Sequence, residues 1–265
     1  MTGFPKFRPE TAASPRALPG RAARWRYNRD RLFAALPENC SSGRESALIL
    51  FESRLTSAAT METKVKICGI TNLADAQAAV EAGADALGFN FYEKSPRYVS
   101  LKTAAAISKQ LPPFVMRVGV FVDAEADFVL RAISEAGLTM LQFHGDEPPE
   151  FCTQFGLMSM KAFRIRDAES LKKIPDYLTD AYLLDAFSST TLGGTGEKFN
   201  WDLAVAAQKF GRPIFLAGGL TPENVAEAVK KVRTFGVDVS SGVESAPGKK
   251  DHAKVKAFIE AVRKA

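Results

Sequence analysis

The sequence predicts an α/β protein in which residues 61–265 form a (β/α)8 TIM barrel. Segments typical of strands and of helices alternate eight times, which favours a parallel sheet with right-handed crossovers. The 205 residues from 61 to 265 suit this barrel, whose usual size is about 200–250 residues. The structural alternative is an open doubly wound sheet. The Gly-x-Gly-x-x-Gly turn typical of that fold does not follow the first strand.

The first strand and helix illustrate how the segments are assigned. Successive side chains of a strand point to opposite faces, so Lys66 and Cys68 share the face opposite to Val65. A glycine then permits a sharp turn, and Thr71 or Asn72 can cap the helix that follows.

The other units follow the same alternation. The expected strands are residues 65–68, 86–89, 114–122, 139–143, 159–165, 182–185, 213–217 and 236–239. The expected helices are residues 73–82, 101–110, 125–136, 148–155, 168–174, 202–210, 222–232 and 253–264.

Residues 1–60 differ from the rest in charge and composition. They contain ten basic and five acidic residues, a balance of +5, out of 35 basic and 30 acidic residues in the whole chain. The remainder therefore has 25 of each and is neutral, which gives no support to a general nucleic-acid surface. We expect residues 1–60 to be a disordered extension, or to result from a start assigned upstream of Met61. An organelle transit peptide is the minor alternative.

The cysteine and histidine counts restrict the compartment and the cofactors. The three cysteines have no paired spacing, which indicates a reducing compartment and argues against disulfides and a zinc site. With two histidines, the sequence does not offer a His-rich metal site. It also lacks an apolar run of 18 residues, so no membrane span is expected. We therefore predict a cytoplasmic protein without a metal.

Two strand ends carry groups suited to proton transfer. In this barrel, catalytic residues lie where strands end. Cys68 ends the first strand, and Lys66 on the same face is expected to favour its thiolate; the alternative is a small buried apolar residue. Asp185 ends the sixth strand, where a cap or a salt bridge is the alternative role. A thiolate and a carboxylic acid at one barrel mouth would supply a base and an acid.

Two glycine-rich segments follow the seventh and eighth strands, at residues 217–222 and 240–244. Backbone N–H groups at helix starts bind phosphate, and these two loops are the recurrent phosphate site of the barrel. Two tight turns without chemical consequence are the alternative. Pro222 is expected at a helix start.

Further polar residues follow other strands. Arg97 can hold a carboxylate with both arms of its guanidinium, although most surface arginines are merely solvated. Gln142 and His144 share a face at the end of the fourth strand, and a core or rim role is the simpler interpretation of His144. The loop containing Gly194 is placed where a lid or substrate cradle would lie.

The ordered set of these motifs resembles the phosphoribosylanthranilate isomerase family. The resemblance covers residues 64–265 and gives no counterpart to residues 1–60. Phe143 and Asn200 are mild departures from the residues most often found there. The matching segments are Lys66-Ile67-Cys68-Gly69-Ile70-Thr71, Ser95-Pro96-Arg97-Tyr98-Val99, Gln142-Phe143-His144-Gly145, Leu184-Asp185-Ala186, Gly193-Gly194-Thr195-Gly196 with Phe199-Asn200-Trp201, Ala217-Gly218-Gly219-Leu220, and Asp238-Val239-Ser240-Ser241-Gly242-Val243-Glu244.

The resemblance implies an Amadori rearrangement of N-(5-phosphoribosyl)anthranilate in tryptophan biosynthesis, without a metal or organic cofactor. It makes Asp185 the general acid at the ribose ring oxygen and Cys68 the general base at C2′. Arg97 would hold the anthranilate carboxylate. The implied substrate-binding residues are Arg97, Gln142, His144, Gly194, Gly218, Gly219, Asp238, Ser241 and Gly242.

The residues themselves suggest one further contact. Lys66 and Asp238 are both expected to point into the barrel, and closure places the last strand beside the first. A buried charge needs a partner, so we predict a Lys66–Asp238 pair that also shifts Cys68 toward thiolate.

Two rival functions are less consistent with the sequence. The histidine-pathway isomerase performs the same chemistry with two carboxylates, which Cys68 contradicts. A non-catalytic phosphate-ligand sensor predicts loss of Cys68 or Asp185. The expected partner is a small-molecule substrate, not a nucleic acid or a membrane. Association with neighbouring tryptophan-pathway enzymes stays open, as does the oligomeric state.

Overall fold

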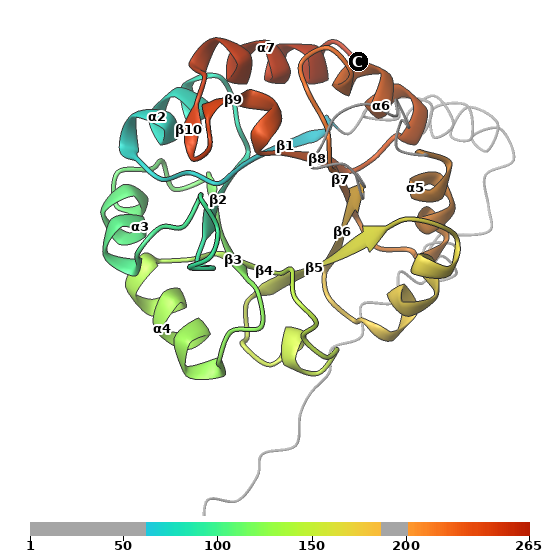
Figure 1. The fold of residues 1–265 in the computed structure, drawn as a ribbon, viewed down its shortest axis with the longest axis horizontal. Helices are drawn as coiled ribbons and strands as arrows, with labels where there is room; N and C mark the ends of the chain where they lie inside the picture. Colours follow the sequence, from blue (N-terminus) through green and yellow to red (C-terminus); the bar gives the residue numbers. More distant parts are fainter. Residues whose placement is uncertain (1–61, 187–200) are drawn as a thin grey trace, which may run out of the picture. The chain divides into compact units, whose positions relative to one another are not determined.

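The computed structural model describes residues 62–186 and 201–265, which form a closed barrel of eight parallel strands ringed by helices (Figure 1). Strands pair in the order β1 to β8, and β8 pairs with β1 to close the ring. The (β/α)8 prediction is therefore confirmed. The expectations for residues 1–60 fall outside the described residues and stay predictions.

The elements agree closely with the expected segments. The barrel strands are β1 (Lys64–Cys68), β2 (Ala86–Asn90), β3 (Met116–Phe121), β4 (Met140–Phe143), β5 (Met158–Ile165), β6 (Ala181–Ala186), β7 (Ile214–Ala217) and β8 (Gly236–Val239). The helices are α2 (Leu73–Glu81), α3 (Leu101–Ser108), α4 (Ala126–Ala136), α5 (Trp201–Ala207), α6 (Val225–Val232) and α7 (His252–Arg263). Four 3-10 helices are η2 (Phe151–Thr153), η3 (Glu169–Asp176), η4 (Gln208–Phe210) and η5 (Ser241–Val243).

Three predictions about local structure need correction. The helices expected after β4 and β5 are the 3-10 helices η2 and η3, and Pro175 within η3 lacks the N–H that an α-helix needs there. Helix α6 begins after Asn224, so Pro222 does not start it. A hairpin of β9 (Glu244–Ala246) and β10 (Lys249–Lys250), which the sequence analysis missed, follows η5.

Side-chain caps fix where several helices begin. Asn72, the second of the two expected candidates, accepts a hydrogen bond from the Asp75 N–H at the start of α2. Asp251 caps α7 in the same way, accepting from the Ala253 and Lys254 N–H groups. These short-range bonds satisfy backbone donors that the first turn of a helix leaves unpaired.

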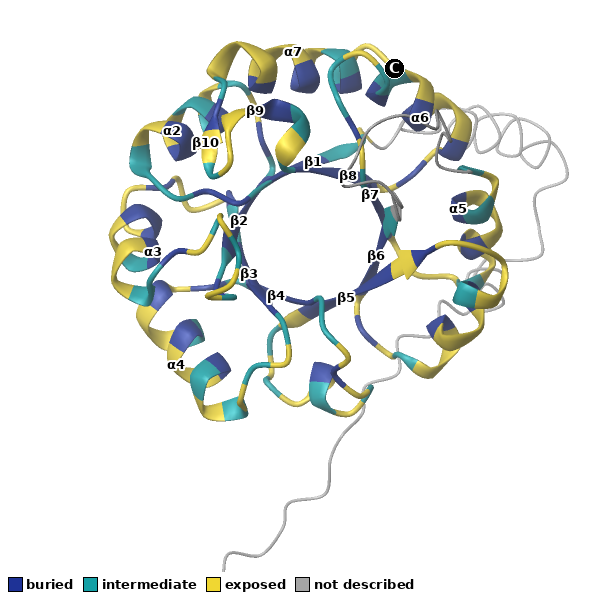
Figure 2. Ribbon diagram, in the orientation of Figure 1, coloured by how far each residue is buried: buried dark blue, intermediate teal, exposed yellow. Residues whose placement is uncertain are grey.

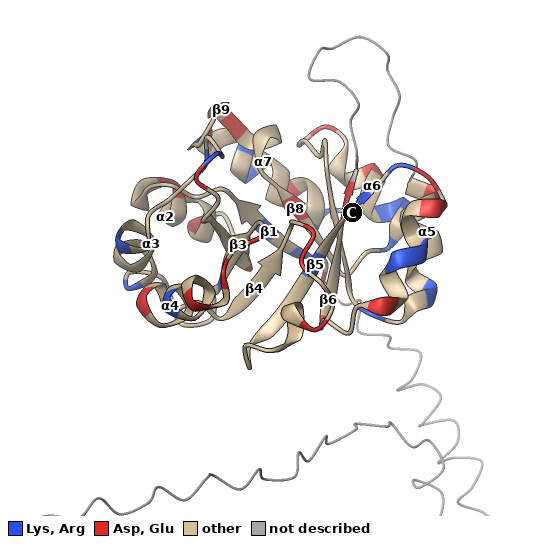
Figure 3. Cartoon of the chain, turned by 60° about the horizontal axis from the view of Figure 1, so that its bottom comes forward, with Lys and Arg blue, Asp and Glu red and all other residues tan. Residues whose placement is uncertain are grey.

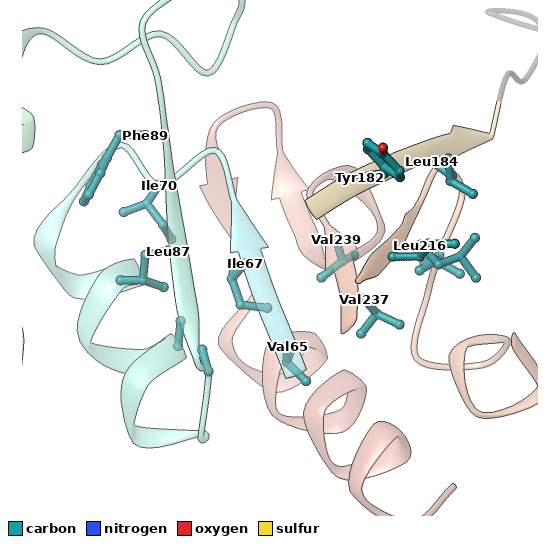
Figure 4. Close-up of a cluster of buried hydrophobic side chains, with 14 of the residues drawn as sticks. Val65, Ile67, Ile70, Leu87, Phe89, Tyr182, Leu184, Leu216, Val237 and Val239 are labelled. Atoms are coloured by element: carbon teal, nitrogen blue, oxygen red, sulfur yellow. The ribbon is translucent and has the colours of Figure 1, made fainter. Parts of the chain in front are cut away.

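The core has two layers because strand residues alternate between the faces of the barrel. One face of each strand packs against the helices, as Val65, Leu87 and Val237 do in Figure 4. The helices bury the side turned toward the barrel and expose the other (Figure 2). The second layer fills the barrel interior and includes Met160 and Leu183.

A buried ion pair supports the loop after β4. Lys161 of β5 points outward from the barrel, and its Nζ lies 2.8 Å from Glu147 Oε2. Lys161 is 3% exposed and Glu147 is 4% exposed. The Glu147 carboxylate also accepts from the backbone N–H groups of Asp123 and Gly145, so its charge is matched by four hydrogen bonds.

Residues of both charges are distributed along the outer helices (Figure 3). Among the described residues, the helices are too short or too polar to cross a bilayer.

Candidate active site

A pocket of about 280 Å³ opens at the carboxyl ends of the barrel strands. It contains every predicted site residue that the structure describes, whereas Gly194 lies outside the described residues. Those residues are Cys68, Arg97, Gln142, His144, Asp185, Gly218, Gly219, Asp238, Ser241 and Gly242. Asn90 and Ser240 also line the pocket and were not predicted.

Cys68 reaches the pocket from the end of β1, beside a strand that leaves room for it. Cys68 is in register with Gly88 of β2. A Cβ at Gly88 would lie 2.9 Å from the Cys68 sulfur and 3.0 Å from Lys66 Nζ. The absence of a side chain at this position therefore allows the thiol and the ammonium group to share one space.

The predicted Lys66–Asp238 pair is present beneath the thiol. The two residues are in register across the β1–β8 seam, and Lys66 Nζ lies 2.7 Å from Asp238 Oδ1. Lys66 is 1% exposed. Burial lowers the pKa of Lys66, but the charges of Asp238 and Cys68 outweigh it and raise the pKa above its ordinary value.

The pair acts on Cys68 in the expected direction, but burial of the thiol has the larger effect. Burial raises the pKa of the Cys68 thiol, and the Lys66 ammonium opposes that effect without cancelling it. Asp238 raises the pKa further. Lys66 has the larger effect of the two, so the pair shifts Cys68 toward thiolate as predicted, but burial outweighs the pair and the net pKa is raised.

Asp185 lies at the end of β6 and belongs to a row of three polar side chains. Its Oδ2 is 3.3 Å from His144 Nε2. His144 Nδ1 is in turn 3.1 Å from the amide nitrogen of Gln142. The polar residues predicted at the end of the fourth strand therefore contact the residue predicted at the end of the sixth.

Arg97 is already bound to a protein carboxylate. Its Nε and Nη2 donate to the two oxygens of Glu244, at 2.8 and 2.7 Å. Lys250 Nζ donates to the same carboxylate at 2.9 Å and to the Ser240 carbonyl oxygen. Burial raises the pKa of Glu244, but its hydrogen bonds from Arg97 and Lys250 outweigh this and lower it overall. No spacing in the sequence indicated the roles of Glu244 and Lys250.

The two glycine-rich loops lie against each other at the pocket rim. Gly218 and Gly219 have φ of 83° and 64°, which glycine adopts at little cost. A Cβ at Gly242 would overlap the carbonyl oxygen of Leu220. The close approach of these backbones requires a glycine at position 242. Among the described residues, the buried Ser240 hydroxyl has no hydrogen-bond partner.

Comparison with known proteins is consistent with this geometry. The family described as N-(5'-phosphoribosyl)anthranilate (PRA) isomerase matches residues 65–261. A relative from Geobacter sp. (strain M21), named N-(5'-phosphoribosyl)anthranilate isomerase, is 59% identical over 202 residues. The alignment covers 76% of this chain and 98% of the relative.

Two solved structures share both the fold and much of the sequence. The phosphoribosyl anthranilate isomerase of Thermotoga maritima is 45% identical with a TM-score of 0.72, covering 77% of this chain and 100% of that one. An isomerase in complex with reduced 1-(o-carboxyphenylamino)-1-deoxyribulose 5-phosphate is 44% identical with a TM-score of 0.70, at the same coverage. This chain therefore belongs to the phosphoribosylanthranilate isomerase family.

Proposed function

We propose that this protein isomerises N-(5-phosphoribosyl)anthranilate in tryptophan biosynthesis, with Asp185 as the general acid and Cys68 as the general base. The observation that carries the assignment is that one pocket is lined by the ends of β1 and β6, which bring both groups to the same small molecule. We assign this activity to residues 61–265 and treat residues 1–60 as an extension outside it.

The first step is opening of the ribose ring. Asp185 gives its proton to the ring oxygen, and the bond from that oxygen to C1′ breaks. The lone pair of the anilinic nitrogen forms a double bond to C1′, which gives an iminium ion. Asp185 becomes a carboxylate.

The second step moves the double bond. The Cys68 thiolate removes the proton from C2′, and that electron pair forms the C1′–C2′ double bond while the iminium electrons return to nitrogen. The resulting enolamine tautomerises, as C1′ gains a proton and the C2′ hydroxyl loses one, to the 1-deoxyribulose product. Substrate and product are isomers, so the reaction requires no external oxidant.

The remaining pocket residues suit the two anionic ends of the substrate. Among the described residues, no protein acceptor binds Arg97 Nη1, and this edge of the guanidinium is the one we assign to the anthranilate carboxylate. The backbone N–H groups of the two glycine-rich loops would hold the phosphate. These are the groups of Gly218, Gly219, Ser241 and Gly242.

We also propose a cytoplasmic location and a small-molecule substrate as the partner, with no nucleic acid or membrane. The three cysteines without paired spacing support a reducing compartment.

The test follows the fluorescence decay of freshly made phosphoribosylanthranilate. We expect Cys68→Ser and Asp185→Asn each to lower kcat about 10²–10⁴-fold, the usual contribution of one acid or base. Cys152→Ser is the matched control, because Cys152 is buried outside the pocket. Undiminished turnover in either pocket variant would remove that residue from its role.

A further inference from the structure

Gln142, His144 and Asp185 form a row of contacting polar side chains in the pocket. The roles of general acid and base proposed above give no function to Gln142 or His144. Gln142 is 1% exposed and ends β4 on the interior face. Its amide nitrogen contacts His144 Nδ1, and His144 Nε2 contacts Asp185 Oδ2. We propose that Gln142 and His144 are positioning residues that orient the carboxyl group of Asp185, and that they do not bind the substrate. The inference rests on Asp185 as the general acid.

The chemistry of the amide sets the tautomer of the imidazole. An amide nitrogen donates hydrogen bonds and does not accept them. With the amide nitrogen of Gln142 at Nδ1, that ring nitrogen must accept, so the single proton of a neutral imidazole lies on Nε2. The Nε2–H then faces Asp185 Oδ2 across the 3.3 Å contact, and we infer that it donates to that oxygen.

This hydrogen bond determines which oxygen of Asp185 carries the acidic proton. An oxygen that accepts from Nε2–H is the carbonyl oxygen of the protonated acid. The proton therefore lies on Oδ1, the other oxygen of the carboxyl group. After Asp185 has given up its proton, the same bond becomes charge-assisted and stabilises the carboxylate. The row itself transfers no proton.

The same contacts leave His144 without a polar atom for the substrate. Nδ1 is within hydrogen-bond distance of Gln142, and Nε2 lies 3.3 Å from Asp185 Oδ2. The other nearby candidate for orienting the acid is Arg164, which is in register with Asp185 on β5. Among the described residues, no hydrogen bond or ion pair joins Arg164 to Asp185, whereas His144 Nε2 lies 3.3 Å from Asp185 Oδ2, so the imidazole is the group that we assign to holding the carboxyl.

The first experiment separates positioning from substrate binding. We expect His144→Leu to lower kcat about 10²-fold, as misplacement of a reacting group does. KM should change by less than about threefold, because the variant removes no interaction that binds the substrate in its ground state. The dissociation constant for the reduced product analogue named above should be equally insensitive. His144→Gln, whose amide nitrogen can still donate to Asp185, should recover part of the lost kcat.

The second experiment replaces the hydrogen-bond donor at position 142 with an acceptor, which reverses the direction of the hydrogen bond to His144. A carboxylate in Gln142→Glu accepts from Nδ1–H, so Nε2 becomes the acceptor and faces Asp185 without a proton. Asp185 then directs its proton to Nε2 or transfers it there, and in both cases the proton is not available to the ribose ring oxygen. We expect kcat to fall while analogue binding is retained. Gln142→Met, which removes the donor without adding charge, should reduce kcat less.

The outcomes distinguish this inference from the function on which it rests. Undiminished kcat in His144→Leu, or weaker analogue binding in step with a raised KM, would overturn the positioning role. If His144→Leu does not fold, as judged by thermal unfolding, Gln142→Glu and His144→Gln decide the question in the same way. Asp185→Asn is measured beside them. If Asp185→Asn loses activity but the His144 and Gln142 variants do not, only the positioning role of His144 and Gln142 is refuted. If Asp185→Asn retains full activity, the role of Asp185 as the general acid is refuted.

Discussion

Two buried lysine–carboxylate pairs share the same chemistry and differ in their surroundings. Lys66–Asp238 lies inside the barrel beneath Cys68, and Asp238 lines the pocket. Lys161–Glu147 lies outside the barrel, where backbone N–H groups enclose the carboxylate. The comparison teaches that a buried ion pair acquires its role from the group beside it. The first pair is adjacent to the thiol of Cys68 in the pocket, and the second holds a loop.

The largest loss of stability is expected from breaking the enclosed pair. Lys161→Met leaves the Glu147 charge buried without its cation, which costs about 3–5 kcal/mol of folding free energy. Urea unfolding measures this. The remaining folded protein should isomerise the substrate normally, because Lys161 does not line the pocket. A variant as stable as the unchanged protein would show that the backbone donors alone satisfy Glu147.

Breaking the interior Lys66–Asp238 pair should destabilise the protein less than breaking Lys161–Glu147, but it should reduce the activity more. In Lys66→Met the uncompensated Asp238 still borders the pocket, where water can reach it, so we expect a loss of about 1–3 kcal/mol. Parallel urea unfolding and kinetic assays test both halves. Equal stability losses in the two lysine variants would show that access to the pocket does not matter.

The third prediction concerns the pH at which Cys68 reacts. Because the pKa of Cys68 is raised, its thiolate should form at higher pH than that of an ordinary cysteine, and kcat/KM should rise with pH through this ionisation. Lys66→Met removes the group that lowers this pKa, so the rise should move to still higher pH. Iodoacetamide labelling in a Cys40→Ser, Cys152→Ser background isolates the thiol. A curve that does not move would remove Lys66 from the electrostatics of the site.

The smallest effect is expected from an exposed pair of the same length. Lys172 Nζ lies 2.7 Å from Glu169 Oε2, but both side chains are about 70% exposed. Glu169→Gln should change the stability by less than about 0.5 kcal/mol. This variant is the control for the first two, since it matches the distance and lacks the burial. A loss comparable with that of Lys161→Met would mean that burial is not the deciding variable.

The sequence was sufficient to predict the barrel and most of its elements. Alternation within strands and the order of strands and helices are local patterns, so β1 and α4 fall close to the expected ranges. The hairpin of β9 and β10 was missed because its strands are only three and two residues long. Its residues are held largely by distant groups, as in the bond from Thr71 Oγ1 to the Gly248 carbonyl oxygen.

The site was predictable where topology alone brings residues together. Strand ends of a parallel barrel meet at one mouth, which brought Cys68 and Asp185 to one pocket and paired Lys66 with Asp238. The partner of Arg97 was not predictable, because Glu244 is 147 positions away on a hairpin that was not expected. The raised pKa of Cys68 was not predictable, because desolvation depends on packing, which one strand does not reveal.

Lys66 and Asp238 meet at the seam of the ring although 172 positions separate them in the chain. A ribosome therefore makes the thiol early and supplies its charged neighbours, Asp238 and Lys250, near the end of translation. Until the last strand pairs with the first, a nascent chain carries Cys68 without these two charges beside it. The charged surroundings of Cys68 are therefore complete only when translation is almost finished.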